Sequence, residues 1–121
     1  MKAILSRRNK RSQQGWELRL DPLQRVVFTT EGLSNSGSGL AALDLVSRTA
    51  LDTGVWIHVS AVWGRTANGS QRKEIYINGE LDYTGGAEPT PTTNTLPLRI
   101  GSDSAGCCDF DGRQVAGQLQ N

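Results

Sequence analysis

Short runs of alternating hydrophobic and polar residues recur along the chain, and this period of two predicts β-strands. The clearest run spans 15–20, where Trp16, Leu18 and Leu20 share one side. Asp21-Pro22 interrupts this run, because proline cannot continue a central strand. Residues 25–30 are rich in β-branched and aromatic side chains and form the return strand. The two runs predict a hairpin with its turn at 21–24.

The segment 54–85 holds the strongest strand signals. The run Val55–Trp63 is hydrophobic or small at nearly every position, which predicts a strand that is buried on both sides or passes through the middle of a sandwich. His58 lies inside this run, where a packed core histidine is the expectation rather than a catalytic one. No nucleophile motif accompanies it.

A hairpin follows in the same segment. Residues 74–77 form one strand, and Asn78-Gly79 supplies the positive φ angles of a type I′ turn. The return strand is 80–84. Its alternation places Leu81 and Tyr83 on one face.

Two further runs complete the predicted strands. Residues 40–47 fit helical spacing as well as period two, and their place among strands favours a strand. Residues 96–100 alternate with Leu96, Leu98 and Ile100 inward. In the remaining tail, 101–121, the expected hydrophobic anchors are Phe110 and Val115.

Composition agrees with one β-rich domain that spans residues 1–121. Hydrophobic residues make up 36% and charged residues 21% of the chain, which excludes a disordered polypeptide. No run approaches the ~18 apolar residues of a membrane span, and the first residues lack a signal-peptide pattern. The localisation of the protein stays open. We expect no membrane partner.

The net charge of +1 excludes a strong overall field toward nucleic acid. Residues 6–14 are nevertheless basic and contain no acid; their cations are Arg7, Arg8, Lys10 and Arg11. This segment is either a phosphate-contacting patch or a solvated loop. No aromatic residue interleaves the charges, so a loop is favoured and no nucleic-acid partner is expected.

Several motifs occur in an order that resembles laminin G-like domains of the concanavalin A-like lectin/glucanase jelly-roll family. Their residues are Trp56, His58 and Val59; Tyr76, Asn78, Gly79 and Glu80; Leu98, Ile100 and Gly101; and Phe110 and Gly112. The resemblance covers most of the chain and implies an all-β, antiparallel β-sandwich.

The resemblance does not extend to a strand before Ile4, and the residues after Arg113 match the family's last strand only weakly. The sandwich is therefore expected to lack a terminal edge strand. Because an uncovered edge is a pairing hazard, we expect a homodimer, and light scattering that gives a monomer would count against it.

The resemblance implies a non-catalytic binding module, with carbohydrate as the first ligand class and a protein partner as the alternative. Sugar recognition uses aromatic faces and polar groups on loops, which makes Trp63 and Tyr83 the candidate ligand-binding residues. Core packing is the competing role for both. A glucan hydrolase is less favoured, because no pair of acids alternates along one strand.

A calcium ion is the candidate cofactor. Asp103, Asp109 and Asp111 crowd one glycine-rich segment, and Ca²⁺ prefers carboxylate and carbonyl oxygens. The alternative is three solvated acids. The adjacent Cys107 and Cys108 are either two reduced thiols, a vicinal disulfide or soft-metal ligands.

Overall fold

The structure of the chain is a computed structural model that describes residues 2–33, 39–65, 71–86 and 89–102. These residues form eight β-strands and no helix. The strands are β1 (Lys2–Asn9), β2 (Gln14–Leu20), β3 (Arg25–Leu33), β4 (Leu40–Ala50), β5 (Val59–Arg65), β6 (Gln71–Ile77), β7 (Glu80–Gly86) and β8 (Arg99–Ile100). No helix in these ranges has the length and hydrophobicity that a membrane crossing needs.

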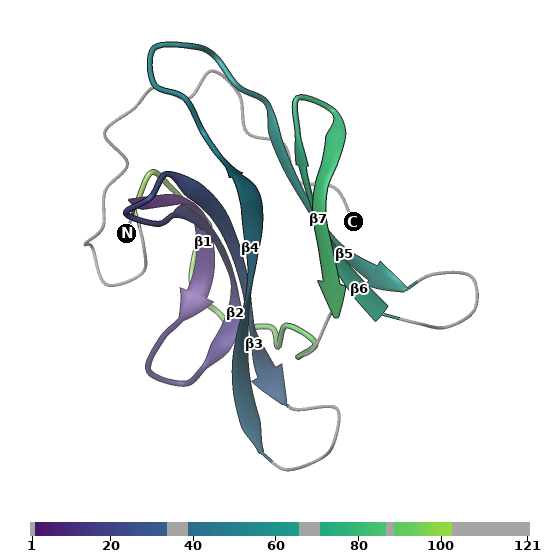
Figure 1. The fold of residues 1–121 in the computed structure, drawn as a ribbon. Helices are drawn as coiled ribbons and strands as arrows, with labels where there is room; N and C mark the ends of the chain where they lie inside the picture. Colours follow the sequence, from purple (N-terminus) through teal and green to yellow (C-terminus); the bar gives the residue numbers. More distant parts are fainter. Residues whose placement is uncertain (1, 34–38, 66–70, 87–88, 103–121) are drawn as a thin grey trace.

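All strand pairs are antiparallel and belong to two sheets. One sheet has the order β4-β3-β2-β1-β8, and the other has the order β5-β6-β7. The two sheets face each other across the core (Figure 1). This arrangement confirms the predicted antiparallel β-sandwich.

Hydrophobic side chains from both sheets meet between the layers. The buried core consists of Leu18, Leu20, Val26, Phe28, Leu45 and Ile75. Strand alternation explains this set, because every second residue of a strand points to the same face. Burial of each such side chain contributes roughly 1.5–3 kcal/mol to folding. The core face predicted for 15–20 and the strand predicted for 40–47 are both confirmed.

The β6–β7 hairpin has the predicted turn but a different register. Asn78 and Gly79 have φ angles of 52° and 80°, as a type I′ turn requires. A β-bulge then interrupts the pairing, so that Leu81 lies opposite Tyr76 and Tyr83 opposite Ile75. The prediction that Leu81 and Tyr83 share a face is therefore wrong. Tyr83 faces the core and Leu81 is 51% exposed.

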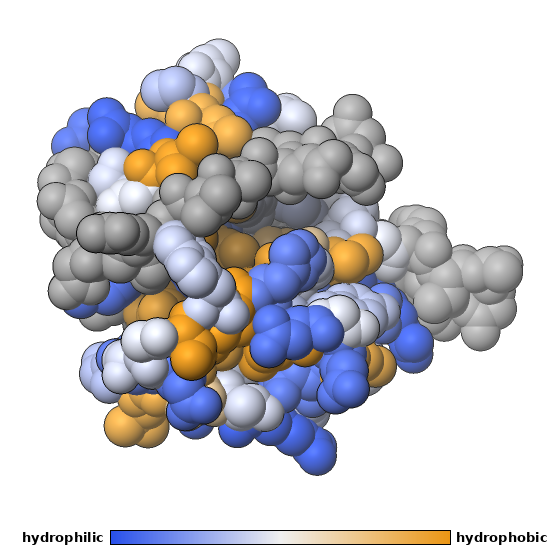
Figure 2. Space-filling view, turned by 90° about the horizontal axis from the view of Figure 1, so that it is seen from above, coloured by the Kyte–Doolittle hydropathy of each residue, from blue (hydrophilic) through white to orange (hydrophobic). Residues whose placement is uncertain are grey.

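The run 55–63 is only partly a strand. β5 begins at Val59, and Val55 and Trp56 are 62% and 64% exposed in the β4–β5 connection. This connection lies at the top of Figure 1, and the view from above in Figure 2 shows hydrophobic residues exposed among hydrophilic ones. The predicted burial of the whole run is wrong, because sheet pairing to β6 starts only at Val59.

The first and last strands, β1 and β8, also differ from the sequence-based prediction. Residues 6–9 belong to β1 rather than to a loop, and β8 contains only two residues, with Ile100 62% exposed. β8 pairs with β1 at Leu5 and Ser6. Phe110 and Val115 lie outside the described residues. The homodimer stays a prediction, since it concerns a second copy of the chain.

Candidate functional site

The segment 89–102 runs across the ends of three strands before it reaches the β1 edge (Figure 1). The amide of Thr92 donates to Glu31 O on β3 at 3.1 Å. Asn94 Nδ2 donates to Gln14 O at 3.2 Å and to Arg7 O at 3.0 Å. The segment is thus tied to β3, β2 and β1 in turn, and the sheet fixes its position.

Two glycines leave room for the crossing segment against the strands. A Cβ atom on Gly32 would lie 2.2 Å from Thr90 O, and one on Gly15 would lie 2.7 Å from Asn94 Nδ2 and 2.0 Å from Arg7 O on β1. Real Cβ atoms do not approach other atoms that closely, so a larger residue at Gly32 would displace the segment, and one at Gly15 would displace both Asn94 and the paired strand β1.

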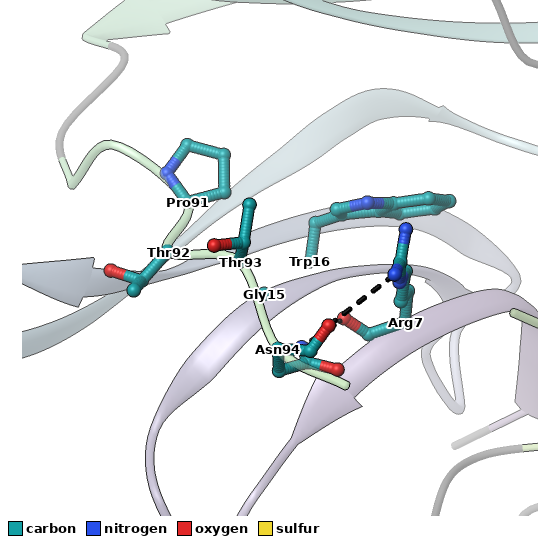
Figure 3. Close-up of a pocket in the computed structure, with 7 residues that line it drawn as sticks. All are labelled: Arg7, Gly15, Trp16, Pro91, Thr92, Thr93 and Asn94. Atoms are coloured by element: carbon teal, nitrogen blue, oxygen red, sulfur yellow. Dashed lines mark hydrogen bonds between the residues drawn. The ribbon is translucent and has the colours of Figure 1, made fainter. Parts of the chain in front are cut away.

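A cleft of about 170 Å³ opens between this segment and the strands. Its lining residues are Arg7, Gly15, Trp16, Pro91, Thr92, Thr93 and Asn94. Figure 3 shows the indole of Trp16 and the side chain of Arg7 on one side, with the 91–94 segment along the other. Trp16 is half-buried and also packs against the core. The cleft therefore joins an aromatic surface to hydroxyl, amide and guanidinium groups.

Arg7 is held in place by the crossing segment. Its Nε donates to Leu96 O at 3.2 Å, and its Nη2 donates to Asn94 O at 3.3 Å. The register pairs Arg7 with Trp16 on neighbouring strands, which sets the two side chains on the same face of the sheet. Two main-chain contacts thus orient a cation beside an aromatic ring.

The opposite face of the same sheet carries a series of charges that is buried or half-buried except at Asp44, whose side chain is 45% exposed. Its members, which we call the ion-pair row, are Arg8, Glu17, Arg19, Glu31 and Asp44. Arg19 joins Asp44 at 3.0 Å and Glu17 at 3.3 Å. Arg8 Nη1 lies 3.7 Å from Glu17 Oε1, and Arg8 Nη2 contacts Glu31. The row spans four strands and replaces the solvent-facing polar side expected of 15–20.

The ion-pair row also determines what its acids can do. Burial lowers the pKa of Arg8, but its hydrogen bond to Glu31 and the charges of Glu31, Glu17 and Asp44 outweigh that effect and raise the pKa above its ordinary value. Glu17 and Glu31 are each 2% exposed. Glycoside hydrolysis needs two carboxyl groups that flank a bound sugar. Two enclosed carboxylates that pair with arginine do not meet that need.

Trp63 and Tyr83, the sequence-predicted ligand-binding residues, lie on the sheet β5-β6-β7. Both are half-buried and pack against the core. The Cζ atom of Arg48 lies 4.8 Å from the centre of the Tyr83 ring, which is within range of a cation–π contact. Their place on the inner face is that of packing residues. A ligand-binding role for them stays a prediction.

The remaining candidates are the predicted calcium ligands and the two adjacent cysteines. Asp103, Asp109 and Asp111, with Cys107 and Cys108, lie outside the described residues, so calcium binding also stays a prediction. Elsewhere, in the ranges that the structure covers, no three His, Cys, Asp or Glu side chains group as metal ligands would.

His58 is exposed rather than packed in the core. Its backbone N–H donates a hydrogen bond to Asn78 Oδ1 at 3.0 Å, and its carbonyl oxygen accepts one from the backbone N–H of Asn78 at 2.8 Å. Ser60 Oγ lies 3.5 Å from His58 Nδ1. The expected core role of His58 is wrong, because β5 begins one residue later.

The cleft itself was missed at the level of sequence. Trp16 belongs to a run with the pattern of a core strand, and 91–94 belongs to a Pro/Thr-rich segment that is far away in sequence. The available signal was Asn94 and its threonine neighbours in a segment with the composition of a crossing loop. Nothing in their spacing points to Arg7 or Trp16.

Comparison with protein families gave a match that covers most of the chain. A laminin G family model, described as the concanavalin A-like lectin/glucanases superfamily, matches residues 1–114. The chain belongs to the concanavalin A-like lectin/glucanase superfamily. Comparisons with curated proteins and with solved structures gave no significant match.

Membership of the concanavalin A-like superfamily agrees with the two-sheet architecture and confirms the resemblance found in the sequence motifs. It indicates a lectin-like or other binding module, in a superfamily whose description also includes glucanases. The fold alone does not determine the ligand, which depends instead on the residues of the site.

Proposed function

We propose that this concanavalin A-like domain is a non-catalytic module that binds carbohydrate in the cleft beside Trp16. The observation that carries the proposal is the convergence of the Trp16 indole, the Thr92 and Thr93 segment and the Arg7 guanidinium in one cleft. An aromatic ring packs against the apolar face of a sugar, and hydroxyl and amide groups bind its edge.

The position of the cleft supports this use. Trp16 and Arg7 belong to paired strands, and 91–94 is bonded to those same strands. Binding residues on loops that a rigid sheet positions lose little conformational freedom when a ligand arrives. The arrangement favours a preformed site over one that must be assembled.

The absence of catalysis is part of the proposal. Support comes from Glu17 and Glu31, whose carboxylates are enclosed and paired with arginine rather than directed at the cleft. A variant in which either acid is replaced by glutamine is expected to keep full sugar binding if it folds.

Protein recognition is the second candidate, and the exposed Val55 and Trp56 favour it. Both are more than 60% exposed, and aromatic residues are enriched in protein interfaces. This surface lies in the β4–β5 connection, whereas the 91–94 segment, which lines the cleft, crosses the sheet at the other end of the strands (Figure 1). Substitutions can therefore test the two functions separately.

The test is a glycan array followed by calorimetric titration of the best sugar into wild type, Trp16→Ala and Trp56→Ala. We expect Trp16→Ala to weaken binding about five- to tenfold, since stacking of an aromatic ring contributes on the order of 1–1.5 kcal/mol. Trp56→Ala should change affinity less than about twofold. Thr93→Val, which removes one exposed hydroxyl of the cleft, is a second variant in case Trp16→Ala unfolds.

Two results would contradict the proposal. One is sugar binding that survives in Trp16→Ala and Thr93→Val. The other is an array without hits, combined with a protein partner that is captured by wild type and lost in Trp56→Ala.

A further inference from the structure

The two arginines of β1, Arg7 and Arg8, lie on opposite faces of the sheet. Arg8 points into the ion-pair row, and Arg7 points to the opposite face, where it lines the cleft. Alternation along the strand explains this division. One arginine therefore neutralises buried acids, and the other remains at the surface.

The hydrogen bonds that the Arg7 guanidinium makes with the described residues orient it but use only part of its N–H donors. Its two bonds, to Leu96 O and Asn94 O, use Nε and Nη2, and a guanidinium has five N–H donors in all. Arg7 is exposed, and Figure 3 shows it directly beside the Trp16 indole. It presents further donors, in a fixed plane, to whatever packs on that ring.

The acids on the neighbouring strands do not cancel this charge. Glu17 and Glu31 lie in the ion-pair row, each with an arginine partner and each buried. The other groups that line the cleft are uncharged. A carboxylate bound beside Trp16 would thus meet a cation and neutral donors, which is the geometry that favours charge-assisted hydrogen bonds.

The size of the cleft limits what it can enclose. Its volume of about 170 Å³ is below the ~300–1,000 Å³ of pockets that enclose drug-sized ligands. One pyranose ring is a better match than an oligosaccharide. The cleft is then a site for a terminal or branching sugar.

We propose, on the basis of the carbohydrate-binding function above, that the preferred ligand is a single pyranose that carries a carboxylate. Trp16 packs on the ring, and Arg7 binds the carboxylate through the N–H groups that have no hydrogen-bond partner among the described residues. The guanidinium supplies the positive charge in this site, so acid recognition does not require calcium.

The experiment compares methyl glucuronide with methyl glucoside, which differ in the carboxylate at one carbon, in buffer that contains chelator. Calorimetric titrations use wild type, Arg7→Gln and Arg7→Lys, with Arg11→Gln as the matched control, because Arg11 is exposed on the β1–β2 turn and does not line the cleft. Galacturonide and galactoside form a second pair in case the ring stereochemistry is wrong.

Wild type is expected to bind the acidic sugar of a pair at least about tenfold more tightly than its neutral partner. Arg7→Gln should reduce this ratio to about one, and Arg7→Lys should retain part of it, because lysine keeps the charge but loses the planar donor set. Arg11→Gln should keep the wild-type ratio. Thermal melting of each variant checks that the anchoring of 94–96 is retained.

The outcomes separate this inference from the proposed function. Equal binding of acidic and neutral sugars, lost in Trp16→Ala, overturns the acid preference and keeps the carbohydrate site. An acid preference that appears only when calcium is added, or that persists in Arg7→Gln, also overturns the inference. Failure of every sugar to bind overturns both.

Discussion

At the scale of single residues, the most unusual group is Lys73 of β6. It is 1% exposed and its Nζ donates to Leu43 O at 2.8 Å. Burial lowers its pKa from 10.5 to about 8, although the charge of Asp44 acts in the opposite direction. An enclosed ammonium is costly to keep charged, so Lys73 should make the stability of the fold depend on pH.

The sign of this dependence follows from proton binding. Between about pH 8 and 10.5 the unfolded chain still holds a proton that the folded chain has released, so the free energy of unfolding rises with pH in this window. Relative to Lys73→Met, wild type should gain about 2–3 kcal/mol across it. Urea denaturation of both proteins from pH 7 to 10 measures the difference.

The exposed Lys10 offers a matched control. Lys10→Met should follow the pH profile of wild type, whereas Lys73→Met should lose the rise. Parallel profiles for wild type and Lys73→Met would show that the buried ammonium is not penalised as the geometry implies.

Residue-scale patterns were the least informative part of the sequence. Glu17 and Arg19 alternate with core residues, which is the pattern of a strand with one side in water. Both are instead enclosed in the ion-pair row. Charge alone does not reveal that the partners Arg8, Glu31 and Asp44 lie on neighbouring strands, since the register that aligns them comes from tertiary pairing.

At the scale of elements, the β-bulge in the β6–β7 hairpin connects the two sheets. The bulge gives β7 one residue more than β6 between the pairs Tyr76–Leu81 and Ile75–Tyr83, and that residue is Asp82. Its carboxylate accepts the amides of Arg48 and Thr49 on β4 at 2.6 and 3.2 Å, together with the Thr49 hydroxyl. One side chain thus occupies backbone donors at the β4 edge.

Asp82→Ala should lower the free energy of unfolding by about 1–2 kcal/mol at pH 7, because a half-buried carboxylate loses its charge-assisted hydrogen bonds. Burial raises the pKa of Asp82, but the bonds from Thr49 and Arg48 outweigh it and hold that pKa below its usual value of 3.8. The stabilisation is present above this usual value and is lost as pH falls through the lower folded pKa.

Denaturant titrations of wild type and Asp82→Ala at pH 7 and at pH 2–3 test this contribution. The gap between the two proteins should narrow at acid pH. Asp52→Ala, an exposed change in the β4–β5 connection, should leave stability within about 0.5 kcal/mol. A gap that is the same at both pH values would contradict the role of the carboxylate charge.

The elements themselves were largely predictable. Asn78-Gly79 predicted the type I′ turn, and period-two alternation located β2. The β-branched and aromatic residue types located the first part of β3, and the place of 40–47 among strands favoured β4. The sequence does not mark the bulge at Asp82, because a bulge changes pairing without changing residue type. The pattern over 55–63 also failed, because a hydrophobic run does not state where pairing begins.

At the scale of the whole molecule, the sandwich could be predicted and the cleft could not. Hydrophobic alternation and motif order both indicate two packed antiparallel sheets. The cleft instead depends on the approach of the 91–94 segment to two residues that are far away in sequence, Arg7 and Trp16. Gly15 and Gly32 leave room for Asn94, Thr90 and Thr92 of the crossing segment, but a glycine in a strand marks close approach without naming the partner.

The most direct test of the carbohydrate-binding cleft is an NMR titration of ¹⁵N-labelled protein with the tightest sugar from the glycan array. We predict saturable shifts of the Trp16 indole N–H and of the amides of Arg7 and 92–94, with little change at the amides of β5 and β7. Shifts centred on Trp63 and Tyr83, or no shift at millimolar sugar, would contradict it.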